Sequence, residues 1–388
     1  MNIIANGLTL HADESGRGPL TLVFLHYWGG TARTWHPVMA ALPENLRKIS
    51  LDARGWGQSD RPEDGYDIAT MADDVEAAIA ALGLERYVLV GHSMGGKVAQ
   101  LLASRRPSGL VGLVLVAPSP AEGKSLPEPE REDMAGAYAV PESVGWTIDN
   151  VLTERPLSPT LRDQVIADSL GGAEAAKKFW PYTAISEDVS ADLARIDVSV
   201  WVIGGQQDKV DGVDMLRRVV LPSLPGAVMR SVPGVGHLIP LEAPQAVAAS
   251  IVEFVDAELS SECRTAKQPE DVPAIFDSAL NRGDLDAVMS LFHPEAIMRM
   301  QDGKTIAEGR DALRGAFAQL IPAQPEIRNG VRRVIASGDI ALLLLEWTIR
   351  LTPPGQDELV ERGVATQVVE RNADGIWQLR ISNPLGID

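Results

Sequence analysis

Short, nearly uninterrupted apolar runs alternate with helical patterns along the first two thirds of the chain. A run of this kind is typical of a strand that is buried on both faces of a parallel sheet. The clearest helical pattern, 71–82, is followed directly by Gly83, and glycine often ends helices. Strand and helix in alternation predict the α/β class, with a doubly wound, mostly parallel sheet. The apolar runs are 21–26, 87–91, 110–116 and 198–203.

A polar stretch without periodicity, 260–269, ends in a proline and separates two regions of different pattern. The chain has 388 residues, which is enough for two domains. We therefore expect one domain at 1–259, a linker at 260–269 and a second domain at 270–388.

The second region has its helical patterns first and its long strands last. In the strand expected at 340–351, Leu345, Trp347 and Ile349 alternate with polar residues, as a sheet with one buried face requires. Helices grouped ahead of an antiparallel meander predict an α+β domain. The helical patterns are 272–280, 285–292 and 312–320, and the strand patterns are 340–351, 359–370 and 376–382.

The composition excludes several classes of partner. A formal net charge of -18 repels phosphate backbones and anionic lipid, so we expect neither nucleic acid nor a membrane surface as a partner. The single cysteine, Cys263, excludes an internal disulfide framework and a multi-cysteine metal site. The first seven residues lack the basic and apolar regions of a secretory signal. We expect a cytoplasmic protein with no cofactor and no metal.

The segment Gly91-His-Ser93-Met-Gly95 predicts a nucleophilic serine. The pattern Gly-x-Ser-x-Gly is common by chance, but here a buried strand leads into its first glycine and a helical pattern, 96–103, follows it. The serine then lies on a sharp, strained turn, and the two glycines let the strand and the helix approach. The plain alternative is a serine that only caps the helix.

A phosphate-binding loop is the competing interpretation of the same segment. Gly91, Gly96 and Lys97 have the required spacing, but Val98 stands where a hydroxyl is needed to bind magnesium. Nucleotide binding is therefore the weaker hypothesis.

A serine hydroxyl needs an imidazole to accept its proton, and His237 is the best of the six histidines. In a hydrolase of this chain order the acid and then the histidine follow the serine. His237 lies in a glycine-rich loop after the apparent strand 227–232, and the plain alternative is a residue that caps the next helix. The acid between Ser93 and His237 is Asp208, which closes a strand and a small-residue turn, with Glu122 in reserve.

Two backbone N–H groups are needed to bind the negative oxygen of an acyl-transfer intermediate. One is that of Met94, directly after the nucleophile and at the positive end of its helix. The other is expected from Trp28, in the loop after the strand that ends at His26, and we expect His26 to brace that loop. The alternative role for Trp28 is packing in the pocket wall.

Taken together, these residues resemble the α/β-hydrolase superfamily, in particular its esterase, non-haem haloperoxidase and C–C hydrolase branches. The matching segments are 25–30, 52–59, 91–96 and 205–208 with Gly236-His237. Tyr27 departs from the pattern, because the family usually has glycine after the histidine. Ser93 argues against the epoxide hydrolase and haloalkane dehalogenase branches, whose nucleophile is a carboxylate.

In such hydrolases a helical cap is inserted where residues 121–196 lie in this chain. Aromatic residues of this stretch would line an apolar pocket or attach the cap to the core. With Tyr27, the candidates for the substrate pocket are Trp146, Trp180 and Tyr182, and Phe179 is a further aromatic of the cap.

The second domain resembles the SnoaL-like, cone-shaped α+β superfamily through 279–287, 308–312 and its closing strands. The resemblance implies a possible homodimer through this domain and, in some relatives, a small molecule inside the cone. The candidates to face such a cavity are Arg299, Glu346, Trp377 and Arg380, for which core and surface roles are the alternative.

The leading hypothesis is a serine hydrolase that cleaves a carboxylic ester or lactone of a small, partly apolar molecule through an acyl-enzyme. A second hypothesis keeps the triad but cleaves a C–C bond or forms a peracid. The third, from another class, is a hydrolase-like receptor that binds its ligand without turnover.

Overall fold

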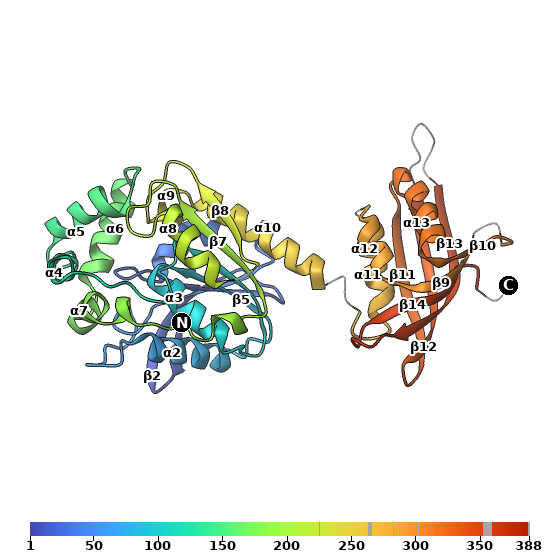
Figure 1. The fold of residues 1–388 in the computed structure, drawn as a ribbon, viewed down its shortest axis with the longest axis horizontal. Helices are drawn as coiled ribbons and strands as arrows, with labels where there is room; N and C mark the ends of the chain where they lie inside the picture. The colour runs from blue at the N-terminus through green and yellow to red at the C-terminus, as the bar shows by residue number, and fades with distance from the viewer. Residues whose placement is uncertain (225, 263–265, 282, 301–302, 352–358, 387–388) are drawn as a thin grey trace. The chain divides into compact units, whose positions relative to one another are not determined.

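The chain divides into two compact units, Met1–Glu258 and Leu259–Asp388. Figure 1 shows that each unit has a sheet and helices of its own. Cys263 lies outside the described residues. The computed structural model describes residues 1–224, 226–262, 266–281, 283–300, 303–351 and 359–386.

The N-terminal unit is built on an eight-stranded sheet, counted in the described part of the chain, with the order β1-β2-β4-β3-β5-β6-β7-β8. The pairs β1 with β2 and β2 with β4 are antiparallel, and all pairs from β4 to β8 are parallel. The predicted doubly wound, mostly parallel sheet is confirmed. The strands are β1 (Asn2–Ala5), β2 (Leu8–Ser15), β3 (Thr21–Leu25), β4 (Arg47–Leu51), β5 (Tyr87–His92), β6 (Leu110–Val116), β7 (Ser199–Gly205) and β8 (Val228–Val232).

The central strands are apolar throughout because both of their faces are covered. In β5, Tyr87 and Leu89 enter one hydrophobic core, whereas Val88 and Val90 enter another on the opposite face. The first core is closed by α2 (Ile68–Ala81) and α3 (Met94–Ser104), and the second by α1 (His36–Ala41) and α10 (Pro244–Glu262). This layering brings the carboxyl ends of the parallel strands to one edge, where such folds carry their chemistry.

The helix expected at 71–82 begins earlier, at Ile68, because the Asp67 carboxylate accepts a hydrogen bond from the Thr70 N–H at 2.8 Å and caps it. At the other end of the unit, α10 continues to Glu262. The helix therefore includes the first three residues of the stretch that was expected to be the linker, 260–269. Ser260, Ser261 and Glu262 are polar, but none of them is glycine or proline, so nothing in them stops a helix.

A group of helices lies between β6 and β7, within the stretch predicted as the cap. In the described part of the chain, no helix is both long and apolar enough to cross a membrane. The cap helices are α4 (Glu128–Gly136), α5 (Pro141–Thr147), α6 (Pro159–Leu170) and α7 (Glu174–Tyr182), and the short helices α8 (Val213–Met215) and α9 (Ile239–Glu242) follow later.

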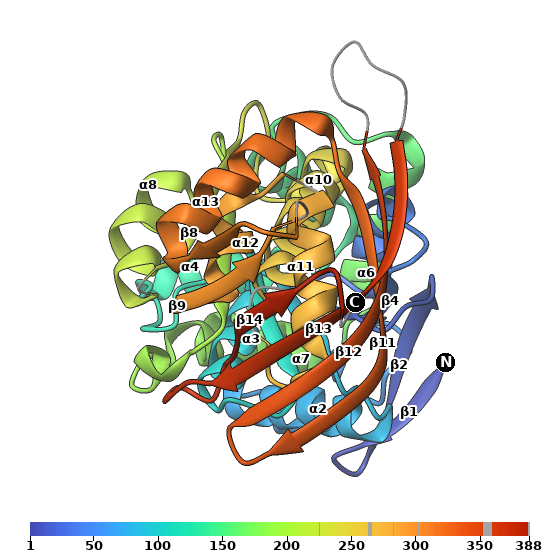
Figure 2. The same ribbon diagram turned by 90° about the vertical axis from the view of Figure 1, so that its right-hand side faces the viewer.

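The C-terminal unit has six described strands in the order β10-β9-β14-β13-β12-β11. Among these described strands, only β14 and β9 pair in parallel. The long strands curve around the helices on one face of this sheet (Figure 2). The elements are α11 (Asp271–Asn281), α12 (Leu285–Ser290), β9 (Phe292–Arg299), β10 (Ile306–Glu308), α13 (Gly309–Leu320), β11 (Glu326–Ser337), β12 (Ile340–Leu351), β13 (Leu359–Arg371) and β14 (Trp377–Asn383).

The predicted α+β class of this unit is confirmed, but three of its strands were missed: β9, β10 and β11. The helix expected at 285–292 ends at Ser290, and Phe292 already begins β9. Pro294 lies inside β9, and proline argues against a strand in a sequence pattern. In β12 the predicted alternation is confirmed, because Leu345 and Ile349 are buried and Glu346 is exposed.

Candidate active site

Ser93 lies on a sharp turn between β5 and α3. Its backbone has φ 52° and ψ −112°, a strained conformation for a residue that is not glycine. The Ser93 side chain makes no capping hydrogen bond to α3. The plain role of a helix cap is therefore not the one that this serine has.

Gly91 and Gly95 allow the close approach that this turn needs. A Cβ atom on Gly91 would lie 2.5 Å from the Gly95 carbonyl oxygen, and one on Gly95 would lie 2.5 Å from the Leu25 carbonyl oxygen. Both distances are shorter than a carbon and an oxygen tolerate without a bond. The two glycines thus let β5, α3 and β3 meet at the serine.

Lys97 does not point toward a phosphate site. Its ammonium is buried and donates to three backbone carbonyls of the segment that leads out of the cap, those of Ala184, Ile185 and Glu187. Burial lowers the pKa of Lys97 to about 8. Because its donors are used within the protein, Lys97 fastens the cap segment to α3, and the phosphate-loop interpretation loses its key residue.

His237 and Asp208 come together at the carboxyl edge of the sheet. The His237 Nδ1 atom lies 2.9 Å from Asp208 Oδ2, and both side chains are buried. Asp208 Oδ1 accepts hydrogen bonds from the backbone N–H groups of Val210 at 2.7 Å and Asp211 at 3.1 Å. A carboxylate held in this way fixes the histidine with Nδ1 protonated and Nε2 free to accept a proton.

The electrostatics of this pair favour a charged aspartate beside a histidine that protonates readily. Burial acts to lower the pKa of His237, but the Asp208 carboxylate outweighs it and raises the pKa above the ordinary 6.5. Burial acts to raise the pKa of Asp208, and His237 with the backbone donors nevertheless lowers it below 3.8. The pair is therefore suited to holding a proton on the imidazole during a reaction.

Ser93 and His237 line the same cavity, which has a volume of about 470 Å³. No hydrogen bond joins the serine hydroxyl to the imidazole in the described part of the structure. Such contacts are often long before a substrate is in place and tighten only in the reacting complex.

The loop after β3 is braced by His26, as expected. His26 Nδ1 donates to the Tyr27 carbonyl oxygen at 2.7 Å, while its Nε2 accepts from the Ala53 N–H at 3.0 Å. The same Tyr27 oxygen also accepts from the Gly30 N–H at 3.0 Å. Because this carbonyl is held from two sides, the peptide plane that it shares with the Trp28 N–H is fixed, and that N–H points away from the braced side.

Trp28 and Met94 supply the two candidate oxyanion donors. The Met94 N–H belongs to the first turn of α3, where N–H groups have no partner within the helix. Among the described residues, no hydrogen bond uses the backbone N–H of either Trp28 or Met94. Both residues are buried, and Trp28 lines the cavity.

Tyr138, which the sequence analysis did not single out, holds the outer side of this loop. Its ring packs on that of Trp28 with centroids 4.2 Å apart, and its hydroxyl donates to the Trp28 carbonyl oxygen at 3.0 Å. Tyr138 lies in the cap, between α4 and α5. The only sequence signal was that it is an aromatic residue within the predicted cap.

The backbone of the His237 loop is also held from two sides. The His92 Nε2 atom donates to the His237 carbonyl oxygen at 2.9 Å, and burial keeps the pKa of His92 well below 6.5. From the cap, the Leu152 carbonyl oxygen accepts the N–H groups of both His237 at 2.8 Å and Leu238 at 2.9 Å. The cap thus contributes directly to the position of the histidine.

Three of the four predicted pocket residues line the cavity and one does not. Tyr27 and Trp180 are buried in its wall, and Trp146 lines it with 62% of its surface exposed. Tyr182 is 44% exposed and is not among the described lining residues, so that prediction is wrong. Two residues along α7 correspond to about 200° of rotation, which turns Tyr182 away from the face of Trp180.

Two other acidic residues follow β6 and β7, the predicted Glu122 and Asp211, which was not predicted. Glu122, the reserve acid, is exposed and has no described contact with His237. Asp211 lies in the turn before α8, is buried and forms an ion pair with Lys124; both residues line the cavity. Within the described residues, no group of three or more His, Cys, Asp or Glu side chains is arranged to hold a metal ion.

Sequence comparisons relate the N-terminal unit to known enzymes. Residues 22–250 match the alpha/beta hydrolase family. The chain is 30% identical over 223 residues to the AB hydrolase superfamily protein YisY of Bacillus subtilis (strain 168), with 55% of this chain and 82% of that protein covered. It is also 30% identical over 264 residues to a non-heme chloroperoxidase of Streptomyces lividans, with 63% of this chain and 95% of that protein covered.

The structural comparison gives the same fold. An esterase from Exiguobacterium antarcticum superposes with a TM-score of 0.61 at 22% identity, covering 66% of this chain and 99% of that chain. At this identity the likeness shows the fold alone. In the C-terminal unit, residues 272–378 match the SnoaL-like domain. Both resemblances drawn from the sequence are confirmed.

Proposed function

Because the chain belongs to the alpha/beta hydrolase family, we propose that it is a serine hydrolase which cleaves a carboxylic ester or lactone through an acyl-enzyme. The observation that carries the proposal is the hydrogen-bonded pair of Asp208 and His237 in one cavity with Ser93 on a strained turn. A binding protein has no need of this arrangement, since its parts serve proton transfer.

In the proposed reaction, Ser93 Oγ attacks the carbonyl carbon while His237 Nε2 takes the hydroxyl proton. Asp208 stays ionised and stabilises the imidazolium that forms. The negative oxygen accepts hydrogen bonds from the N–H groups of Met94 and Trp28, each of which is worth about 3 to 4 kcal/mol of barrier. His237 then gives its proton to the leaving alcohol. Water attacks the acyl-enzyme carbonyl while His237 Nε2 takes a proton from it, and that proton passes to Ser93 Oγ as the bond to the acyl group breaks and the acid is released.

The cavity favours a substrate with an apolar part and a polar part. Trp28, Tyr138 and Trp180 supply aromatic walls next to Ser93. The Lys124 and Asp211 ion pair gives one region of the wall a polar character. Its volume of about 470 Å³ lies within the usual range for small-molecule sites.

A fluorophosphonate probe tests the mechanism. The native chain is expected to be labelled at Ser93, and labelling should disappear in Ser93→Ala and fall strongly in His237→Ala. Equal labelling of native protein and Ser93→Ala would contradict the proposal. The turnover of a series of aryl esters with increasing acyl length then shows how long an acyl group the apolar pocket accepts.

The C–C hydrolase and perhydrolase alternatives use the same triad and differ in the bond that is cleaved or formed. Turnover of simple aryl esters well above that of vinylogous diketones supports ester cleavage. The receptor alternative predicts turnover below about one per minute together with thermal stabilisation by ligand.

The homodimer expected from the resemblance stays a prediction. Several large apolar side chains are exposed on the strands of the C-terminal unit, which a second copy would cover. Light scattering on the full chain is expected to give a molar mass of two chains. The variant Val364→Lys is expected to have the molar mass of a single chain. The exposed residues are Val331, Ile335, Ile340, Val360, Val364 and Ile381.

A further inference from the structure

The C-terminal unit encloses a cavity of its own, separate from the catalytic one, with a volume of about 210 Å³. This is about the volume that seven molecules of liquid water occupy. It is smaller than the usual pocket for a drug-sized ligand. Every residue that lines it belongs to the C-terminal unit. A molecule with a single ring therefore matches its size.

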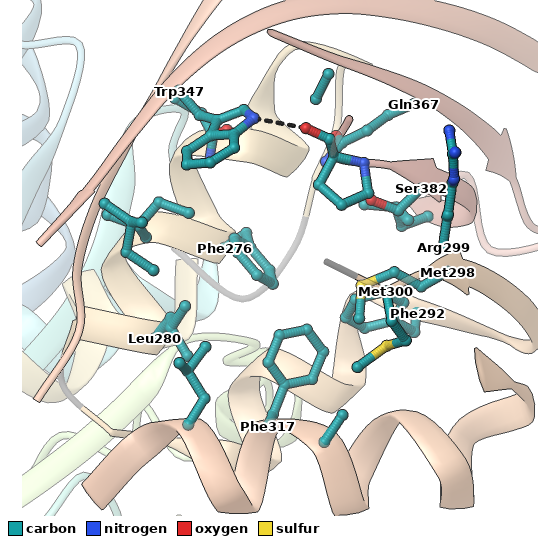
Figure 3. A pocket seen from close by; sticks show the side chains of 18 residues that line it. Phe276, Leu280, Phe292, Met298, Arg299, Met300, Phe317, Trp347, Gln367 and Ser382 are labelled. Carbon is teal, nitrogen blue, oxygen red and sulfur yellow. Dashed lines mark hydrogen bonds between the residues drawn. The ribbon is translucent and has the colours of Figure 1, made fainter. Parts of the chain in front are cut away.

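One side of the cavity is apolar and aromatic. Phe276, Phe292 and Phe317 form a cluster in which the ring centroids lie 5.5 to 6.2 Å apart. Figure 3 shows Phe276, Phe317 and Leu280 around the open space, across from the polar side chains. A hydrophobic ring or chain of a ligand would be stabilised there by burial.

Some of the polar groups in the wall already have partners. The Trp347 Nε1 donates to the Pro384 carbonyl oxygen at 2.8 Å, as Figure 3 shows. The backbone N–H and the side-chain amide of Asn329 donate to Asp277. Neither indole nor amide therefore needs a ligand.

Gln367 differs from these groups. Its side chain lines the cavity with only 7% of its surface exposed, and its Oε1 atom is buried with no hydrogen-bond partner in the described part of the chain. A buried acceptor without a partner costs about 1 to 3 kcal/mol. A ligand that offers an O–H or N–H donor would remove that cost.

The sheet register brings further polar groups to the same place. Ser382 of β14 is paired with Gln367 of β13 on one side and with Met298 of β9 on the other, so Arg299 follows directly. Figure 3 shows Gln367, Ser382 and Arg299 on the same side of the view. This side of the wall holds one buried acceptor, one hydroxyl and one guanidinium.

Arg299 gives the wall of the cavity a positive charge. It is the single charged residue among the described residues that line the cavity. Its Nε donates to the Gly303 carbonyl oxygen at 3.1 Å, and no described carboxylate forms an ion pair with its guanidinium. A carboxylate is the natural partner of a guanidinium that retains free donors.

We propose that this cavity is a second small-molecule site, which binds an apolar acid whose carboxylate and hydroxyl lie at the same end. The carboxylate pairs with Arg299, the hydroxyl donates to Gln367 Oε1, and the apolar end fills the space between the phenylalanines. No acidic side chain or histidine is among the described lining residues. The site therefore binds rather than catalyses, and it does not depend on the hydrolysis proposed above.

Calorimetric titration of the full native chain with 3-phenyllactate tests the site. This probe has a phenyl ring at one end and a carboxylate with an adjacent hydroxyl at the other. We expect saturable binding of one molecule per chain. Removing the hydroxyl, as in 3-phenylpropionate, should weaken binding about fivefold, since a neutral hydrogen bond is lost. Removing the charge, as in 3-phenylpropane-1,2-diol, should weaken it more.

Variants locate the binding. Arg299→Met should weaken 3-phenyllactate binding by roughly ten- to hundredfold, and Gln367→Leu by about fivefold. The matched control is Arg332→Met, which removes the same charge from an exposed arginine that pairs with Glu346 outside the cavity. This control should bind like the native chain.

Absence of saturable binding at millimolar probe would overturn the proposal. Equal affinity for native chain and Arg299→Met, or equal loss in Arg332→Met, would overturn it as well. The comparison of the three probes uses only the native protein, so it decides the role of the hydroxyl even if Gln367→Leu does not fold.

Discussion

The two units of this chain enclose cavities of opposite character. In the N-terminal unit the cavity is lined by His237, which pairs with Asp208, and by Lys124, which pairs with Asp211. In the C-terminal unit the acceptor of Gln367 has no partner and no acid or base is among the described lining residues. The N-terminal cavity thus offers a base for proton transfer, whereas the C-terminal cavity offers groups that are suited to holding a ligand.

Removing one histidine from each unit is expected to give the largest contrast. His237→Ala should lower kcat/KM for an aryl ester by about 10⁵-fold, because the serine loses its base. His293→Ala, in the C-terminal unit, should leave it unchanged. Steady-state kinetics of both variants measures this, and a similar loss in both would mean that the two units act as one catalytic body.

The pH dependence of the triad sharpens the same contrast. His237 must be neutral to accept a proton. Because its pKa is raised, activity is expected to begin to fall at a higher pH than it would with an ordinary histidine. Asp208→Asn should lower kcat by about 10⁴-fold. It should also move the acidic inflection to lower pH, because burial then dominates. Control kinetics with Asp277→Asn should show the native profile, and an unmoved inflection in Asp208→Asn would count against the pair.

Core truncations probe whether the units are stabilised separately. Leu343→Ala removes a fully buried side chain of the C-terminal unit and should cost that unit about 3 kcal/mol of unfolding free energy. The matched change Leu89→Ala should cost the N-terminal unit a similar amount. Ester turnover followed during denaturant titration should shift only for Leu89→Ala. A shift for Leu343→Ala would show that the units unfold together.

The smallest expected effect is a pH-dependent stability confined to the C-terminal unit. Burial raises the pKa of Asp277 to about 6, so the folded unit holds this proton more tightly than the unfolded chain. The resulting stability is complete below about pH 4 and is lost as pH rises through about 6. The full shift corresponds to about 3 kcal/mol, and about 1 to 2 kcal/mol remains after solvent screening of this partly exposed carboxylate. Thermal unfolding of Asp277→Asn should lack this slope, while Asp286→Asn, at an exposed carboxylate, should keep it.

The sequence predicted the secondary structure best for strands that are buried on both faces. Strands such as β5 are apolar on both faces, and their turns carry glycines that only a close approach explains, so the sheet, Ser93, Asp208 and His237 could all be named in advance. The C-terminal strands are buried on one face only, so they lack the continuous apolar runs that mark a buried strand in the sequence. The missed strand β11 contains Arg332 and Arg333 at a bulge, where alternation breaks down.

Partners that meet only in three dimensions could not be predicted. Tyr138 and Leu152 are far from Trp28 and His237 in sequence, and they act through a hydroxyl and a backbone carbonyl that carry no sequence pattern. Tyr182 was misplaced for a related reason, because an aromatic residue in a helix does not indicate which face it occupies. Asp211 was missed because a turn of unknown length separates β7 from α8.

The hydrogen bonds from His237 and Leu238 to the Leu152 oxygen also limit how molecules enter and leave. If the whole cap lifted, this carbonyl would withdraw and the imidazole would lose its backbone support, so a fully open molecule would be inactive. Substrate entry is therefore compatible with catalysis only while the residues near 152 stay in contact with the His237 loop. The cap is thus tied to the proton-transfer machinery through one backbone carbonyl group.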